Sequence, residues 1–178
     1  MQSAGGISKT NEWIEFNEAM LAVLNSPRYR KRFIEEIKND FPGIPPLTQP
    51  ALRQKLAHLG KRLICAQLLK AEVPESAFCF RGTLGEKIQS PELVENSLRI
   101  SDSGFFEGVE PSVYEFNLAG YQVCKNWVNA GNKSGIQRKG TALTSCQAQL
   151  FRRVLFGISE SITARTLVDK ILMEQLGW

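Results

Sequence analysis

Histidine and cysteine are scarce in the sequence, which limits the chemistry that the chain can carry. The one histidine, His58, has no cysteine within a helical turn, and no two of the four cysteines have the spacing of a metal site or redox motif. The cysteines are Cys65, Cys79, Cys124 and Cys146. We therefore expect no metal site, and buried thiols in a reducing compartment.

Long hydrophobic runs are also missing. No apolar run approaches the roughly 20 residues that a membrane-spanning helix needs, and Met1 to Thr10 has no apolar core like that of a signal peptide. These absences predict a protein that stays in the cytoplasm and has no membrane partner.

The motifs of common catalytic sites are absent as well. The turn from Arg81 to Gly85 has neither the glycine spacing nor the lysine of a phosphate-binding loop. His58 occupies a polar position of an amphipathic pattern, which favours a surface histidine over a catalytic base. The paired prolines Pro45 and Pro46 lack the Asn or Asp before them and the aromatic residue after them that hold a flipped adenine. We expect no catalytic residue and no cofactor.

The overall composition is that of an ordinary folded protein, with 43% hydrophobic and 22% charged residues and no internal repeat. The net charge of +4 is mildly basic. It is compatible with a polyanionic partner and equally with a plain solvated surface.

The first half of the sequence has helical periodicity. Residues 12–25 and 28–40 carry apolar side chains at helical spacing, and Ser26-Pro27 provides a cap and a first residue for the second helix. Residues 42–46 form a proline-rich connector, after which Thr48 can cap a third helix that continues to about residue 70.

From residue 73 onward the texture changes to short alternating runs separated by Gly, Pro, Ser and Asn. Strands are expected at residues 78–81, 97–100 and 113–116, followed by a short helix at 120–127, a loop at 129–135, and one long helix or two in series from residue 144. The predicted fold class is α+β. The predicted organisation is a disordered N-terminus (1–11), a helical lobe (12–72) and a second lobe (73–178) with a small β region and C-terminal helices.

The candidate binding residues are cationic and planar side chains of the second lobe. Lysine and arginine neutralise phosphates, and glutamine and arginine can make paired hydrogen bonds to base edges. These candidates are Arg81, Tyr121, Gln122, Lys125, Lys133, Gln137, Arg138 and Lys139. For residues 132–139, spacing alone favours a soluble connector. A second basic cluster, residues 28–32, is a secondary candidate for phosphate contact.

Several stretches resemble the C-terminal specificity region of type ISP restriction-modification enzymes. Residues 23–33 (VLNSPRYRKRF), 40–45 (DFPGIP) and 57–63 (AHLGKRL) are similar to its helical part. Residues 105–116 (FFEGVEPSVYEF) and 119–128 (AGYQVCKNWV) are similar to its most recognisable block, and the last helix also fits. The resemblance covers most of the chain from about Trp13, in the family's own order.

The resemblance implies a target-recognition region for duplex DNA, in enzymes related also to adenine-specific methyltransferases, whose catalytic portions this chain lacks. We therefore expect a non-catalytic specificity module that binds double-stranded DNA and works with a methyltransferase or restriction subunit in trans. The alternatives are a helical protein-interaction module, or a gene remnant, that docks on a methyltransferase without binding DNA. An enzyme in its own right ranks last.

Overall fold

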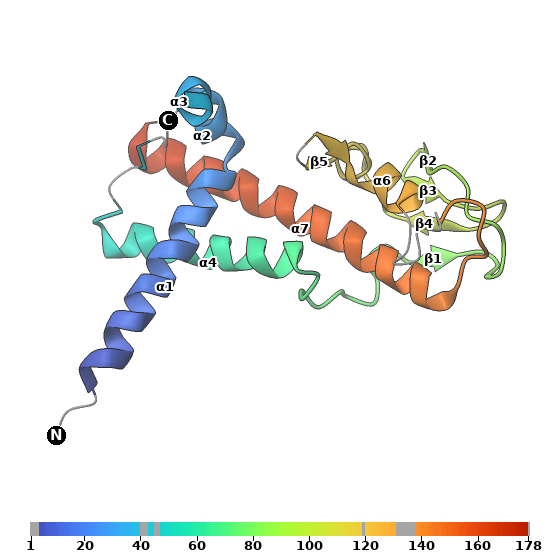
Figure 1. Cartoon of the computed structure of the whole chain (residues 1–178), viewed down its shortest axis with the longest axis horizontal. Helices are drawn as coiled ribbons and strands as arrows, with labels where there is room; N and C mark the ends of the chain where they lie inside the picture. The colour runs from blue at the N-terminus through green and yellow to red at the C-terminus, as the bar shows by residue number, and fades with distance from the viewer. Residues whose placement is uncertain (1–3, 40–42, 45–46, 119, 131–137, 178) are drawn as a thin grey trace. The chain divides into compact units, whose positions relative to one another are not determined.

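The computed structural model describes residues 4–39, 43–44, 47–118, 120–130 and 138–177. Helices and a small antiparallel sheet are both present, so the predicted α+β class is confirmed (Figure 1). The contacts divide the chain into a helical unit, Met1–Leu68 with Glu160–Trp178, and a mixed unit, Leu69–Ser159. No helix in the described ranges combines the length and apolar character needed to cross a membrane.

The helical unit is built on two helices in close contact. Helix α1 (Ala4–Asn25) packs on α4 (Pro50–Gln67), and the core between the elements includes Val23, Tyr29, Leu56 and Leu172. The helices approach backbone to backbone at Gly60, where an added Cβ would lie 1.9 Å from the carbonyl oxygen of Glu18. Only a residue without a side chain fits this crossing.

The predicted second helix is divided into α2 (Pro27–Arg32) and α3 (Ile34–Asn39). Ser26 caps α2 as expected, with its Oγ accepting the amide of Tyr29 at 3.0 Å. The helix ends at Phe33, whose φ of −110° and ψ of 31° are not helical. No proline or glycine marks this break in the sequence, so the periodic pattern alone predicted one continuous helix.

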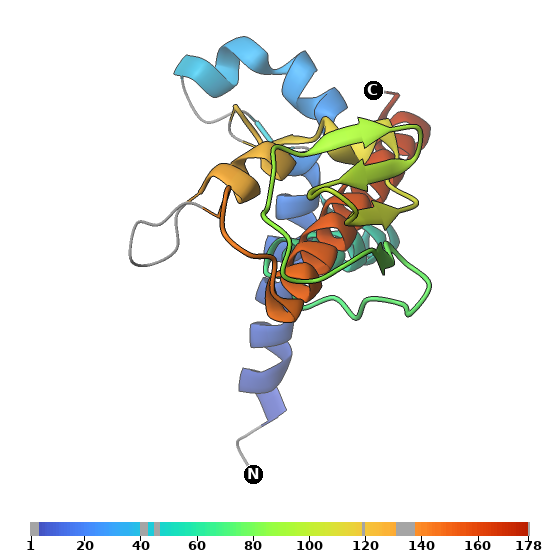
Figure 2. The same cartoon turned by 90° about the vertical axis from the view of Figure 1, so that its right-hand side faces the viewer.

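The mixed unit contains a four-stranded antiparallel sheet in the order β1-β4-β3-β2 (Figure 2). Its strands are β1 (Phe80–Arg81), β2 (Glu92–Val94), β3 (Ser97–Arg99) and β4 (Phe105–Glu107). Aromatic rings form the core beneath it. Phe106 lies 5.3 Å from Phe80 and 5.4 Å from Phe151, and Trp127 stacks on Phe151 at 4.2 Å, all between ring centroids.

After the sheet, the mixed unit continues with a short helix, a hairpin and a further short helix. These are α5 (Pro111–Tyr114), the strands β5 (Asn117–Leu118) and β6 (Tyr121–Gln122), and α6 (Val123–Asn129). The prediction of a strand at 113–116 is wrong. Pro111 occupies the first helical position of α5, and the amides of Val113 and Tyr114 donate to the carbonyl of Glu110.

Helix α7 (Ser145–Leu176) is a single long helix, which decides between the two C-terminal arrangements predicted. Thr144 and Gln147 form a capping box at its start. The Gln147 amide donates to Thr144 Oγ1 at 3.2 Å, and the Thr144 amide donates to Gln147 Oε1 at 2.8 Å.

The ends of the elements differ from the predicted lobes in three respects. Helix α1 already begins at Ala4, and the N-cap position of α4 is Gln49, whose side chain makes no capping hydrogen bond, rather than Thr48. Residues 160–178 group with the helical unit rather than with the second lobe. An apolar stripe shows that a helix faces a core, but it does not show which core.

Candidate nucleic-acid interface

Positive and negative charges are separated along the sequence of the mixed unit. Residues 116–159 contain no Asp or Glu, and all acidic residues of the unit precede them. The cations of this acid-free stretch are Lys125, Lys133, Arg138, Lys139, Arg152 and Arg153. The hairpin, α6 and the beginning of α7 belong to this stretch, so they carry an excess of positive charge.

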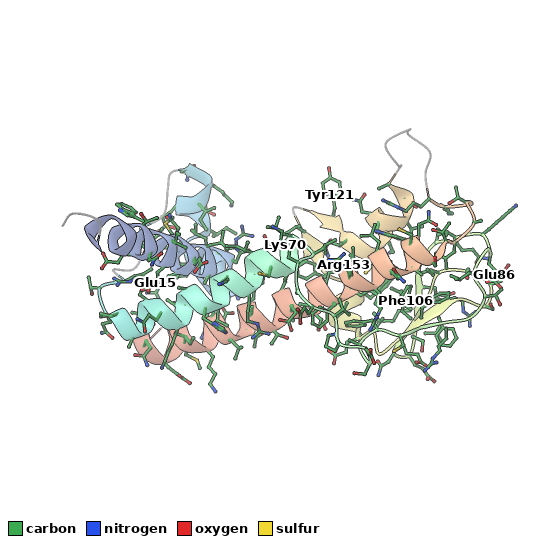
Figure 3. The ribbon with its side chains drawn as sticks, turned by 90° about the horizontal axis from the view of Figure 1, so that it is seen from below. Glu15, Lys70, Glu86, Phe106, Tyr121 and Arg153 are labelled. Atoms are coloured by element: carbon green, nitrogen blue, oxygen red, sulfur yellow. The ribbon has the colours of Figure 1, made fainter. Side chains whose placement is uncertain are left out.

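Tyr121 and Gln122 form strand β6 of the hairpin. Tyr121 is 66% exposed, and its side chain points away from the ribbon in Figure 3. The Gln122 side chain turns the other way, where its Nε2 donates to the carbonyl of Tyr114 at 2.8 Å. Gln122 therefore anchors the hairpin on α5, and Tyr121 is presented to solvent.

Lys125 and Lys139 are both exposed. Lys125 belongs to α6, and Lys139 contacts this helix through its backbone. The Nζ of Lys125 lies 5.8 Å from the centre of the Tyr114 ring, and the backbone amide of Lys139 donates to the carbonyl of Val128 at 3.1 Å. Lys139 also lines a depression of about 560 Å³ together with Glu86 and Asp102. Carboxylates therefore lie near Lys139, whereas the neighbour of the Lys125 ammonium is an aromatic ring.

Arg138 is committed to the fold by its guanidinium. Its Nη1 donates to the carbonyl of Trp127 at 2.6 Å and to that of Ala130 at 3.3 Å, and its guanidinium carbon lies 4.8 Å from the centre of the Trp127 ring. These contacts satisfy carbonyls at the end of α6, which has no further turn to bond them.

Arg81 lies apart from the other candidates, on the edge strand β1 of the four-stranded sheet. Its Nε donates to Glu107 Oε2 at 2.9 Å, and this hydrogen bond and the charge of Glu107 raise the pKa of Arg81. Its charge is therefore offset locally. Two further candidates, Lys133 and Gln137, lie outside the described residues.

The structure thus brings Tyr121, Gln122, Lys125, Arg138 and Lys139 together around the hairpin and α6. These five residues fall into two groups, those that hydrogen-bond within the fold and those that are exposed. Gln122 and Arg138 hold backbone carbonyls, whereas the three other side chains are exposed.

Sequence reasoning did not assign a role to Arg152 and Arg153 of α7. Arg152 donates to the carbonyls of Glu75 and Ala77, at 2.8 Å in each case, and Arg153 donates to the carbonyl of Leu69 at 2.6 Å. The two arginines therefore hold residues 69–77 against the helix. The signal in the sequence was two adjacent arginines at the start of a long helix.

The side chains with nucleophilic or metal-binding chemistry are dispersed. Within the ranges that the structure describes, no group of three or more His, Cys, Asp or Glu side chains could hold a metal ion. His58 is exposed, as predicted. The prediction of buried thiols holds for Cys124, whose pKa burial raises to about 12, but it is wrong for Cys146, which is exposed.

The small sheet, the hairpin and the short helices define an α+β domain. Its positive charge is concentrated in residues 116–159, which makes this part a candidate polyanion-binding region. The family model of the Type ISP C-terminal specificity domain matches residues 20–150. The chain therefore belongs to this family, and the resemblance seen in the sequence is confirmed. No curated protein matches the sequence.

Solved structures share the fold. A nuclease-deletion mutant of the Type ISP restriction-modification enzyme LlaGI, in complex with a DNA substrate mimic, is 18% identical, with a TM-score of 0.61 over 88% of this chain. The ATP-dependent Type ISP enzyme LlaBIII bound to DNA is 18% identical, with a TM-score of 0.56 over 85% of this chain. A DrdV–DNA complex is 14% identical, with a TM-score of 0.52 over 90%. The chain spans only 13%, 10% and 18% of these three chains, respectively.

Proposed function

We propose that the chain is a DNA target-recognition module of a type ISP-like restriction-modification system. It binds duplex DNA through the hairpin and α6, and a methyltransferase or nuclease partner supplies the catalysis. The acid-free stretch of residues 116–159 carries this proposal, because it places exposed cations on a unit of a specificity-domain family. The DNA complexes of proteins with the same fold support it.

The exposed lysines are the expected phosphate contacts. Lys125 has no hydrogen-bonded acid among the described contacts, and the side chain of Lys139 is exposed. A lysine that binds a phosphate releases a condensed counterion, so each such contact makes binding more sensitive to salt. Arg138 contributes indirectly, because it fixes the end of the helix on which Lys125 lies.

The test measures binding of the full chain to a fluorescently labelled mixed-sequence duplex by anisotropy over a series of salt concentrations. Lys125→Gln with Lys139→Gln should weaken binding and reduce the slope of log K against log salt by about 0.9 for each phosphate that is no longer neutralised. Lys61→Gln, which removes one charge from an exposed position of α4, is the control and should leave the slope unchanged. Absence of duplex binding at low salt, or binding that does not depend on salt, would overturn the proposal.

A second candidate function is docking of the helical unit on a methyltransferase-bearing protein. Trp13 and Ile14 of α1 are 67% and 50% exposed, and a groove of about 530 Å³ is lined by Glu12, Trp13, Phe16 and Arg53. Exposed aromatic and aliphatic side chains around a groove are typical of protein interfaces.

Co-expression with a type ISP methyltransferase–nuclease polypeptide that lacks its specificity domain tests this function. A stable complex that Trp13→Ser disrupts, without any effect on DNA binding, would support docking. Independent migration of the two proteins in gel filtration would count against it.

A further inference from the structure

The β5–β6 hairpin has an inverted arrangement of polar and apolar side chains. Leu118 and Tyr121 are paired directly across the two strands, so their side chains lie on the same face. That face is open to solvent, because Leu118 is 48% exposed and Tyr121 is 66% exposed. On the other face, Gln122 bonds to the carbonyl of Tyr114. A small sheet normally buries its apolar face and exposes its polar one.

The stem of this hairpin is fixed. The amide of Val123 donates to the carbonyl of Phe116 at 3.1 Å, and Asn117 Nδ2 donates to the carbonyl of Glu115 at 2.7 Å. Gly120 has a φ of +83°, which a residue without a Cβ adopts at low cost in the connection between the strands. Leu118 and Tyr121 are therefore held in place by the backbone and by Gln122 rather than by burial of their own side chains.

The charge around Leu118 and Tyr121 indicates which kind of partner this exposed face binds. Lys125 follows Tyr121 by four residues, and the acid-free stretch continues from there to residue 159. A surface with exposed cations beside an apolar pair matches duplex DNA, whose phosphates flank grooves in which the methyl group of thymine offers apolar surface. By contrast, Leu84 and Val94 of the same unit, which are 46% and 44% exposed, lie in its acidic part.

We propose that Leu118 and Tyr121 contact the bases of duplex DNA through apolar surface, as the part of the hairpin that discriminates sequence, while Lys125 contacts a neighbouring phosphate. This proposal rests on the DNA-recognition function argued above and adds the kind of contact that each residue makes. The ring of Tyr121, rather than its hydroxyl, makes the contact with the base.

A pool of duplexes with a randomised centre tests the proposal. The full chain first selects an enriched sequence from the pool, and its affinity for this duplex is then compared with that for a scrambled one. Leu118→Ala and Tyr121→Ala should each reduce the affinity for the enriched duplex by about tenfold, because each variant loses the burial of an apolar side chain against the DNA, and leave the salt slope unchanged. Tyr121→Phe should bind like the unmodified chain.

Leu84→Ala removes a comparably exposed apolar side chain from the acidic part of the unit and should have no effect. Circular dichroism checks that each variant is folded. The inference is overturned if the pool yields no enriched sequence, if both alanine variants bind as tightly as the unmodified chain, or if Tyr121→Phe loses as much affinity as Tyr121→Ala. Weaker binding on Lys125→Gln, with no effect of the hairpin variants, would leave the proposed function standing and remove this inference alone.

Discussion

Replacing Arg138 by alanine tests whether this arginine belongs to the fold or to the DNA-binding surface. Its guanidinium donates to two carbonyls at the end of α6 and covers the ring of Trp127. The alanine variant cannot make these interactions and leaves the carbonyl of Trp127, which accepts the shorter bond of 2.6 Å, without this donor.

The expected destabilisation follows from the two kinds of interaction. A hydrogen bond from a charged donor contributes about 1.5 kcal/mol at the low end of its range, and a partly exposed cation–π pair contributes about 0.5 kcal/mol. The low ends apply because Arg138 is only partly buried. Arg138→Ala should therefore lower the free energy of unfolding of the mixed unit by about 2 kcal/mol.

The assay is urea unfolding followed by the fluorescence of Trp127. The chain has three tryptophans, so substitution of Trp13 and Trp178 by phenylalanine leaves Trp127 as the only reporter. A decrease of about 2 kcal/mol corresponds to a midpoint lower by about 1 M urea. Arg138→Lys, which keeps the charge but not the planar fork, should recover only part of this stability. An alanine variant with an unchanged midpoint would refute the reasoning and make Arg138 a direct candidate for DNA contact.

Two further predictions concern the helical unit and the buried thiol. Gly60→Ala should lower the free energy of unfolding by about 2 kcal/mol, because overpacking against the backbone of Glu18 outweighs the better helix propensity of alanine, whereas Gly43→Ala, with nothing within 4 Å, should be neutral in the same denaturation experiment. Equal stability of the two variants would contradict the close approach of α1 and α4. Cys146 should react at once with a thiol reagent at pH 8, and Cys124, whose thiol has a pKa of about 12 and is therefore protonated at this pH, should react only on unfolding. Reaction of both at the same rate would show that Cys124 is not buried.

The helices were predictable where the apolar pattern is long. The first and third helices and the C-terminal helix repeat apolar residues over several turns, and the structure contains all three as α1, α4 and α7. Short elements were less predictable. Alternation over three residues is a weak signal, and of the three-residue strands β2, β3 and β4 the sequence predicted only β3. Val113 to Phe116 alternates like a strand, but Pro111 begins a helical turn there.

The part of the chain that carries the candidate site was also predictable, because the cations near α6 are visible in the sequence. Their roles were not, since each role depends on a partner distant in the sequence. Arg81 is offset by Glu107 only because β1 pairs with β4. Arg138 reaches the end of α6 only because the chain returns to it after residue 137. Leu118 was overlooked because it lies between the predicted strand at 113–116 and the predicted helix at 120–127, and because only cationic and planar side chains were taken as binding candidates.

In the hairpin, the residues that shape the fold differ from those proposed to contact DNA, which has a consequence for how such a module acquires new target sequences. The hydrogen bonds that shape the hairpin come from the backbone and from the side chains of Asn117 and Gln122, whereas Leu118 and Tyr121 share the exposed face. Exchanging these two side chains should therefore alter which base pairs are preferred without endangering the fold. Specificity could in this way diversify, or be engineered, at two positions while the scaffold stays unchanged.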